Sequence, residues 1–458
     1  MICFPAFPTA GFPCVFSGHA ADSLNKAGTM YDIPSLLFAD RQGNIYDHPS
    51  LKMAVRSENY NFVPYETELI ELPESSRLYF MPNTHPIAYN QDTANMETFS
   101  GGMAVSAFLA PGFLRLFLPA YKKLDTEILP LYAYTAVGWM NGKFVVPAIK
   151  IDDDSKWNPC LYDYSDAFKP KVQAYLSKYP ENRLYRQLAK CALEYHCTAA
   201  KNVFMGRWEC PIPTAPSCNS RCLGCISKQP AECCPSPQSR IEFVPSPKEI
   251  IEVALNHYET AEEPIISFGQ GCEGDPITEA ETIAKAVSVI KKKAPDMTIN
   301  FNSNCSSPEK LKLLLDAGVD SIRVSMNSAN HTTYEMYYSP VNYDFGDVLK
   351  SIELANKYKV YVSLNLLTIP GVNDREGELN TLLDFLGAYN IDLIQLRNLN
   401  IDPDFLFSKM KFKTEEILGL KNMLKLIKRK NKNVRFGYFN RTKENFFKDF
   451  GFPDLKRR

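Results

Sequence analysis

The fold is decided by Met-Thr-Ile-Asn-Phe-Asn at residues 297–302, Ile-Arg-Val-Ser-Met-Asn at 322–327 and Val-Ser-Leu-Asn-Leu at 362–366. In each stretch apolar and polar side chains alternate, which predicts β-strands. If the apolar set faces covering helices, the polar set faces the lumen of a curled sheet. Unpartnered polar groups are costly in a dry core, so this lumen is interpreted as a cavity for a polar ligand. A sheet with one face in water is the alternative.

Strand and helix signals alternate outward from these stretches, beginning near residue 205. Strands are predicted at 204–212, 264–269, 297–303, 320–326, 360–367 and 391–397, with a further strand near 434–438. Helical stretches lie between them, for example 278–292, where Thr278 is the expected cap. This order predicts an α/β fold, a partial (β/α)6 TIM-like barrel.

The first 200 residues differ from the rest of the chain, because they are rich in aromatic residues and prolines and contain short runs such as 76–80 and 143–146. They predict a β-rich N-terminal domain, residues 1–200, that ends in a helical linker near 182–200. Residues 201–400 form the predicted barrel. Residues 401–458 form a C-terminal extension with one helix and a strand, and contain 16 Lys or Arg against 7 Asp or Glu.

The composition is that of an ordinary globular protein, with 45% hydrophobic and 22% charged residues and a formal net charge of -1. Prolines interrupt the apolar N-terminus, which has no basic region, so we expect it to be retained rather than cleaved as a signal peptide. The apolar stretch 101–121 contains Arg115 and two prolines, which argues against a membrane span. A cytoplasmic protein is expected.

Three of the thirteen cysteines stand close together directly after the first predicted strand, in Cys218-Asn-Ser-Arg-Cys222-Leu-Gly-Cys225. Such spacing allows one loop to wrap a metal centre. A four-iron cluster ordinarily takes four cysteines, so three would leave one iron open to a ligand from outside the protein. An open coordination position is typical of a reactive metal site, whereas structural sites are closed.

A C-x3-C-x2-C loop after the first strand of an α/β barrel resembles the radical S-adenosylmethionine (radical SAM) superfamily. The resemblance implies that Cys218, Cys222 and Cys225 hold a [4Fe–4S] cluster whose fourth iron binds S-adenosylmethionine. It implies reductive cleavage to a 5'-deoxyadenosyl radical, which acts on an unidentified polar substrate held in the lumen. It also implies an external electron donor of the flavodoxin or ferredoxin type.

A second segment follows the strand at 264–269 and reads Gly-Gln-Gly-Cys-Glu-Gly-Asp-Pro at residues 269–276. It resembles the family's Gly-Gly-Glu-Pro segment, which contacts the methionine amino group. The resemblance implies cofactor contacts by Glu273, Gly274, Asp275 and Pro276, with Glu273 in place of the first Gly and Asp275 in place of the Glu. A glycine turn before a helix is the alternative.

Further candidates lie at the ends of the later strands. Ser325 and Asn327 are similar to the family's ribose-binding segment. Gly224 stands where the family usually has an aromatic residue, so the backbone contact to adenine is expected to remain while the ring packing is lost. Four more residues are candidate substrate or cofactor contacts, with purely structural roles as the alternative: Asn302, Asn304, Asn365 and Arg397.

The remaining cysteines and the basic C-terminal extension leave alternatives open. Cys210, Cys233, Cys234 and Cys272 are interpreted as buried thiols, with a second cluster as the alternative. For the whole chain, the alternatives are a zinc-stabilised regulatory or nucleic-acid-binding module and an electron-transfer iron–sulfur protein. The basic extension gives nucleic acid only weak support, because a solvated helix face is its commoner meaning.

Overall fold

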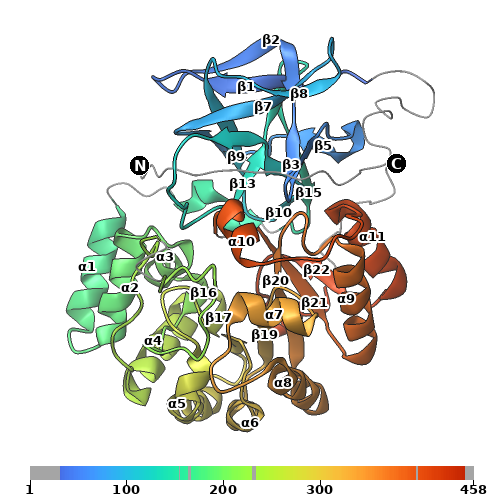
Figure 1. Cartoon of the computed structure of the whole chain (residues 1–458). Coiled ribbons are helices and arrows are strands. Elements are labelled where there is room, and N and C mark those ends of the chain that lie inside the picture. The colour runs from blue at the N-terminus through green and yellow to red at the C-terminus, as the bar shows by residue number, and fades with distance from the viewer. Residues whose placement is uncertain (1–30, 154, 163–166, 230–233, 399–400, 449–458) are drawn as a thin grey trace.

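The computed structural model describes residues 31–153, 155–162, 167–229, 234–398 and 401–448. A β-rich part, drawn in blue and teal in Figure 1, lies over one end of a larger α/β part drawn in green, yellow and red. The prediction that the apolar N-terminus is retained rather than cleaved concerns residues 1–30, which lie outside the described residues. In the described residues, no helix has both the length and the apolar character needed to cross a membrane.

The α/β part is built on seven parallel strands in sequence order, with a helix after nearly every strand (Figure 1). The strands are β16 (Arg207–Pro211), β17 (Glu262–Phe268), β18 (Thr298–Ser303), β19 (Ser321–Met326), β20 (Tyr361–Thr368), β21 (Leu393–Asn398) and β22 (Arg435–Gly437). The predicted strands and the partial barrel are confirmed, including the last strand, which extends the sheet beside β21.

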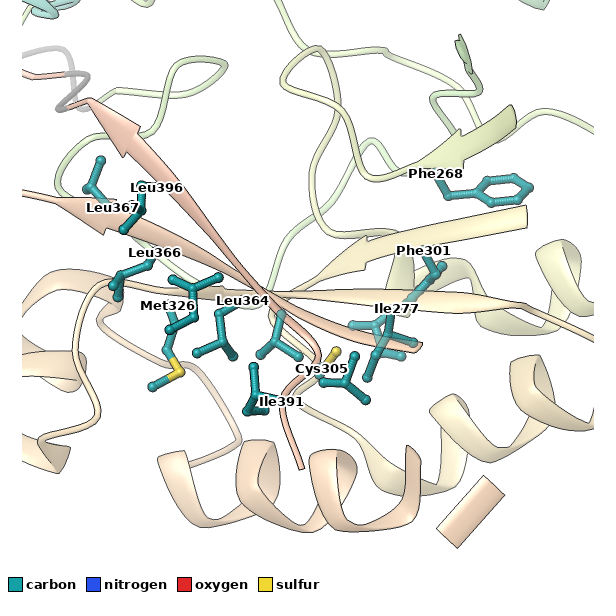
Figure 2. Close-up of a cluster of buried hydrophobic side chains, with 14 of the residues drawn as sticks. Phe268, Ile277, Phe301, Cys305, Met326, Leu364, Leu366, Leu367, Ile391 and Leu396 are labelled. Carbon is teal, nitrogen blue, oxygen red and sulfur yellow. The ribbon is translucent and has the colours of Figure 1, made fainter. Parts of the chain in front are cut away.

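Helices cover the outer face of this sheet because their apolar stripes match the apolar faces of the strands. The helices that follow the strands are α4 (Pro247–Thr260), α5 (Ala280–Lys293), α6 (Pro308–Ala317), α7 (His331–Tyr338), α8 (Phe345–Tyr358), α9 (Glu376–Ala388), α10 (Pro403–Lys409) and α11 (Leu420–Lys430). Of these, α10 lies at the junction with the β-rich part (Figure 1). Figure 2 shows the buried layer between strands and helices, with Phe301, Met326 and Leu364 from three successive strands.

Two details of the predicted helices are wrong. The N-cap of α5 is Glu279, preceded by the 3-10 turn η4 (Pro276–Glu279), and the Thr278 hydroxyl donates to the Asp275 carbonyl instead of capping α5. The helical segment near 182–200 is two helices, α2 (Arg183–Leu193) and α3 (Thr198–Met205), with α1 (Phe168–Lys178) before them. His196, with φ 52°, turns the chain between α2 and α3.

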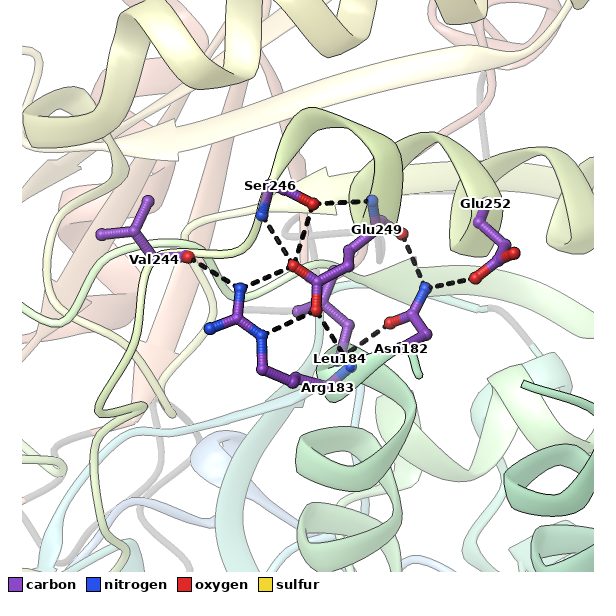
Figure 3. A network of polar contacts seen from close by, with 7 residues as sticks. All are labelled: Asn182, Arg183, Leu184, Val244, Ser246, Glu249 and Glu252. Atoms are coloured by element: carbon purple, nitrogen blue, oxygen red, sulfur yellow. Dashed lines mark hydrogen bonds and ion pairs between the residues drawn. The ribbon is translucent and has the colours of Figure 1, made fainter. Parts of the chain in front are cut away.

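A polar network joins α2 to α4, the first helix after β16 (Figure 3). Arg183 binds Glu249 through two nitrogens, Nε at 2.8 Å and Nη2 at 2.7 Å. Asn182 caps α2 and donates to the Glu249 carbonyl and to Glu252. Glu249 also completes the capping box of α4 with Ser246. The helices that the sequence placed with the N-terminal domain therefore pack against the barrel.

The β-rich part is a 12-stranded sheet with a three-stranded sheet beside it. Its strands are β1 (Ser35–Ala39), β2 (Ile45–Met53), β3 (Val55–Ser57), β4 (Tyr60–Phe62), β5 (Leu69–Glu71), β6 (Arg77–Met81), β7 (Thr84–Asn90), β8 (Asn95–Thr98), β9 (Met103–Phe108), β10 (Phe113–Arg115), β11 (Leu118–Pro119), β12 (Tyr121–Lys123), β13 (Tyr134–Ala136), β14 (Gly138–Met140) and β15 (Lys143–Lys150). Asn141 and Gly142 both have positive φ and form the two-residue turn between β14 and β15, as their types favour.

Buried charges fix the β-rich part to the end of β21. Lys123 on β12 pairs with Asp402 at 2.6 Å and with Asp404 at 3.0 Å, just before and within α10. Asn398, the last residue of β21, accepts from the backbone N–H of Arg115 and donates to the Phe113 carbonyl on β10. The edge of the β-rich sheet is thereby held against the carboxyl end of the barrel strands.

Candidate functional site

A cavity of about 570 Å³ lies at the carboxyl end of the parallel strands. Its volume is in the range of small-molecule sites, and strand ends of this kind are where α/β sheets place their ligands. Strand side chains form one part of its wall: Glu209, Arg323, Ser325, Asn365, Leu367, Arg397 and Asn398. The loop after β16 adds Cys222, Gly224 and Cys225, and the β-rich part adds Pro111.

The loop that carries the three cysteines is held on both sides by backbone hydrogen bonds. Near its start, Ala215 and Ser217 accept from the N–H groups of Gly274 and Asp275 at 2.6 and 3.1 Å. Further along, Arg221 donates its N–H to the Tyr338 carbonyl at the end of α7. The loop therefore owes its position to β17 and α7, which lie far from it in the sequence.

Two of the three thiols of this loop face the cavity. Cys222 and Cys225 line the cavity, and Cys218 does not, although all three are half-buried. Burial raises the pKa of Cys222 well above its usual range, and the neighbouring Cys225 and Cys218 raise it further. Burial and the Asp275 carboxylate raise the pKa of Cys218 to about 11. The thiols are thus close enough to influence one another, and a bound metal would have to displace their protons.

Arg240 supplies a positive charge beside this group. Its Nη2 points at the Cys225 sulfur at 3.6 Å, and its Nε donates to the Ser227 hydroxyl at 3.2 Å. Ser227 in turn donates to the Glu273 carbonyl at 3.1 Å. A guanidinium in this position favours a negatively charged sulfur centre. Arg240 could not be identified from the sequence, because it lies beyond the loop with no motif around it.

In the part of the chain that the structure describes, no three His, Cys, Asp or Glu side chains are grouped closely enough to hold a single metal ion. A closed zinc site of the kind required by the zinc-module alternative is therefore not formed by these residues.

Cys191 and Cys272 lie side by side, and contact with Cys191 is the main cause that raises the pKa of Cys272. Cys210 is fully buried, and Cys233 lies outside the described residues.

Glu273 is buried and accepts five hydrogen bonds. Its Oε2 accepts from the backbone N–H and the hydroxyl of Thr214 and from the N–H of Ala215, at 2.7, 3.1 and 3.0 Å. Its Oε1 accepts from the N–H groups of Gly269 and Gln270, at 2.7 and 3.1 Å. Burial raises the pKa of Glu273 to about 7, and the backbone donors oppose that rise. The side chain braces two loops and does not line the cavity.

Asp275 is also held by hydrogen bonds from neighbouring protein groups. Its carboxylate accepts from the Ser303 hydroxyl at 2.6 Å and from the N–H groups of Asn304 and Ile277 at 2.7 and 3.0 Å. Asp275 therefore caps η4 and ties it to the end of β18, and Pro276 is buried at the first position of that turn. Neither residue lines the cavity.

The glycines of this segment are needed for close approach. A Cβ at Gly274 would lie 1.8 Å from the Ser217 carbonyl oxygen, and one at Gly269, where φ is 79°, would lie 1.7 Å from the Asn302 carbonyl oxygen. Both contacts are to backbone, so a side chain at either position would displace a loop or strand.

The predicted polar residues at the strand ends divide into two groups. Ser325, Asn365 and Arg397 line the cavity, and the buried Asn365 Oδ1 has no hydrogen-bond partner among the described residues. The others do not line it and contact neighbouring protein groups: Asn302 donates to the Phe268 carbonyl, Asn304 to Asn219 and Ser220, and Asn327 to the Thr333 carbonyl.

Aromatic side chains complete the wall, and the sequence analysis missed them. Tyr337 and Tyr338 come from α7, and Trp157 and Phe439 stack on each other with ring centroids 5.3 Å apart. Gly224 also lines the cavity. The aromatic residues Trp157, Tyr337, Tyr338 and Phe439 come from loops and helix ends of distant segments, and none of these four belongs to a periodic pattern or a motif.

Comparison with known proteins gives one family and several distant relatives. Residues 212–383 match the model of the Radical SAM superfamily, which is less than half of the chain. An uncharacterised protein of Methanocaldococcus jannaschii, MJ0804, is 28% identical over 123 residues, or 26% of this chain and 42% of that protein. The match therefore spans less than half the length of this relative.

Solved structures resemble the chain only distantly. Methylornithine synthase (PylB) is 14% identical with a TM-score of 0.35, covering 61% of this chain and 77% of that one. The FeFe-hydrogenase maturase HydG from Carboxydothermus hydrogenoformans is 11% identical with a TM-score of 0.37, covering 62% and 73%. The enzyme anSMEcpe, solved with bound AdoMet, is 14% identical with a TM-score of 0.35, covering 50% and 63%.

Proposed function

We propose, on the premise that residues 212–383 are a radical SAM domain, that this enzyme uses a [4Fe–4S] cluster and S-adenosylmethionine to act on a polar substrate in the cavity. When bound, the cluster and S-adenosylmethionine would together supply a 5'-deoxyadenosyl radical for hydrogen abstraction. The cluster would be held by Cys218, Cys222 and Cys225, and electrons would come from an external donor of the flavodoxin or ferredoxin type.

The observation that carries this proposal is the placement of the cysteine loop at the mouth of a polar cavity. Thiols are the donors that iron–sulfur clusters require, and two of the three, Cys222 and Cys225, face the cavity, with the Arg240 guanidinium beside Cys225. Three thiols are one fewer than a [4Fe–4S] cluster ordinarily takes, which would leave one iron open to S-adenosylmethionine.

The remaining residues would bind, orient and shield. The loop from 269 to 276 holds the cysteine loop through Glu273 and Gly274, so its own backbone is rigid beside the cluster position. Ser325 and Asn365 offer hydrogen bonds to ribose or substrate hydroxyls. Tyr337 and Tyr338 line the cavity and the β-rich part lies over this end of the barrel, so both would help to keep water from a reactive carbon radical.

The test is anaerobic reconstitution followed by analysis of iron, sulfide and 5'-deoxyadenosine after addition of dithionite and S-adenosylmethionine. We expect about four irons per chain and product formation by the native protein. Cys222→Ala should lose both the cluster and the product. Cys160→Ala is the matched control, because Cys160 is exposed and does not line the cavity. Undiminished product from Cys222→Ala would refute the ligand assignment, and tightly held zinc in a colourless protein would favour the alternative.

A further inference from the structure

One wall of the cavity carries two guanidinium groups that have no carboxylate partner. Arg323 on β19 and Arg397 on β21 both line the cavity. Arg323 Nη1 and Arg397 Nη2 donate to the same oxygen, Gln395 Oε1, at 3.0 and 2.8 Å. Neither forms an ion pair with a carboxylate of the described chain, whereas the buried Arg375 pairs with Glu58. The two guanidinium groups therefore face the cavity without an ion-paired carboxylate among the described residues.

Gln395 fixes the orientation of both arginines. Its Oε1 accepts two hydrogen bonds, and its Nε2 donates to the Phe439 carbonyl at 3.2 Å and to Asn440 Oδ1 at 2.9 Å. A side-chain amide has two acceptor and two donor positions, so all four hydrogen-bonding positions of the Gln395 amide are occupied. Because the amide is neutral, it positions the guanidinium groups without cancelling their charge.

The strand register places the two arginines on either side of this amide. Ser325, Asn365 and Gln395 are paired across β19, β20 and β21 and form one layer of the lumen. Arg323 lies two residues before Ser325 and Arg397 two residues after Gln395, so one approaches from below the layer and the other from above. Arg323 Nε is buried and lacks a hydrogen-bond partner within the described chain.

The electrostatics of the cavity leave this wall positive. Among the described lining residues the charged groups are Arg323, Arg397 and one carboxylate, Glu209. Glu209 already accepts hydrogen bonds from Gln270 at 3.2 Å and Asn440 at 2.6 Å. Burial, and then the cation of Arg397, lower the pKa of Arg323 to about 9, while Glu209 opposes that shift. Arg323 and Arg397 are half-buried, and a cation that is partly withdrawn from water without a paired anion is destabilised, so a ligand anion would reduce that cost.

We propose that the substrate carries a carboxylate or phosphate group and that Arg323 and Arg397 bind this group. The planar guanidinium fork matches the oxygens of both groups, which a single ammonium would not. This inference rests on the proposed function, since it assigns the substrate end of the same cavity. Cys222 and Cys225 follow β16, and β16 and β21 are separated by four strands in the sheet. The oxyanion would thus be bound by residues of β19 and β21, whereas the cluster loop follows β16.

The experiment measures oxyanion and cofactor binding separately on the reconstituted enzyme. Inorganic phosphate and malonate are titrated by calorimetry, and S-adenosylmethionine by equilibrium dialysis. Arg323→Gln and Arg397→Gln should each weaken the binding of at least one oxyanion probe by at least about tenfold, with S-adenosylmethionine affinity unchanged. Arg397→Lys, which keeps the charge but loses the fork, should lie between. Arg41→Gln is the matched control, because Arg41 is exposed between β1 and β2.

The outcomes separate this inference from the function it rests on. It is overturned if the native enzyme binds neither probe, or if the glutamine variants keep oxyanion binding and lose S-adenosylmethionine affinity. The latter result would assign the arginines to the methionine carboxylate. A third outcome is that the native protein binds an oxyanion but makes no 5'-deoxyadenosine, and that the variants lose oxyanion binding. This outcome would refute the proposed function and retain the oxyanion site. If Arg323→Gln does not fold, oxyanion binding by Arg397→Gln and Arg397→Lys tests the proposal instead.

Discussion

Replacing Glu273 tests whether the two loops below the cavity are held together by one carboxylate. In Glu273→Ala, the backbone N–H groups of Thr214, Ala215, Gly269 and Gln270 all lose their acceptor. Leaving a buried donor unsatisfied costs about 1–3 kcal/mol, and four donors at the lower value give a loss of about 4 kcal/mol in the free energy of unfolding. Glu273→Gln keeps the shape but turns an amide N–H₂ toward two of these donors.

For Glu273→Gln the amide nitrogen should face Gly269 and Gln270, because these are half-buried and water can replace the lost acceptor there, whereas Thr214 and Ala215 are fully buried. We expect a loss of about 2 kcal/mol.

The assay is urea unfolding of the cluster-free protein, followed by fluorescence and analysed by linear extrapolation. Glu262→Gln is the matched control, because Glu262 is exposed at the start of β17, and it should change stability by less than about 0.5 kcal/mol. A loss below about 1 kcal/mol for Glu273→Ala would refute the bracing role. If stability falls as expected, the reconstituted variant should also hold less iron, since the cysteine loop would lose one of its anchors.

Two further perturbations concern buried positions. Gly274→Ala places a Cβ 1.8 Å from the Ser217 carbonyl oxygen, so it should displace the cysteine loop and reduce the iron content of the reconstituted protein severalfold. Gly387→Ala is the control, because a Cβ at Gly387 meets open space and should leave the iron content unchanged. Equal iron content in the two variants would contradict the close packing at Gly274. Burial lowers the pKa of His257 to about 4 from 6.5. The unfolded chain then binds the extra proton, so stability should fall by about 3 kcal/mol as pH drops from about 6.5 to 4. His257→Gln should remove this part of the slope of unfolding free energy against pH.

The strands and the cysteine loop could be predicted because their signals are local. Alternating polarity at 297–302 and 322–327 determines which face of each strand packs on helices, and that period survives in the folded chain as β18 and β19. The spacing of Cys218, Cys222 and Cys225 places three thiols on one loop whatever the surroundings.

The helical segment near 182–200 shows where local signals fall short. Its apolar spacing predicts a helix, but the chain turns at His196 and forms two helices. The ion pair of Arg183 with Glu249 on α4 joins the first of them to the barrel. Glu273 and Asp275 show the same limit for the site. Their acidic character is visible in the sequence, yet the folded chain surrounds both with backbone donors, and neither lines the cavity.

The sequence by itself determined the type and order of the barrel strands, the polar character of the lumen and the three thiols of the loop. Only the tertiary structure decided which polar groups face the cavity and which are used up by neighbours. It also brought Arg323 and Arg397 onto one amide and placed Arg240 beside Cys225. The physical reason is that strand period and loop spacing act over a few residues, whereas the hydrogen-bond partner of a buried charge comes from whatever distant segment the packing brings beside it.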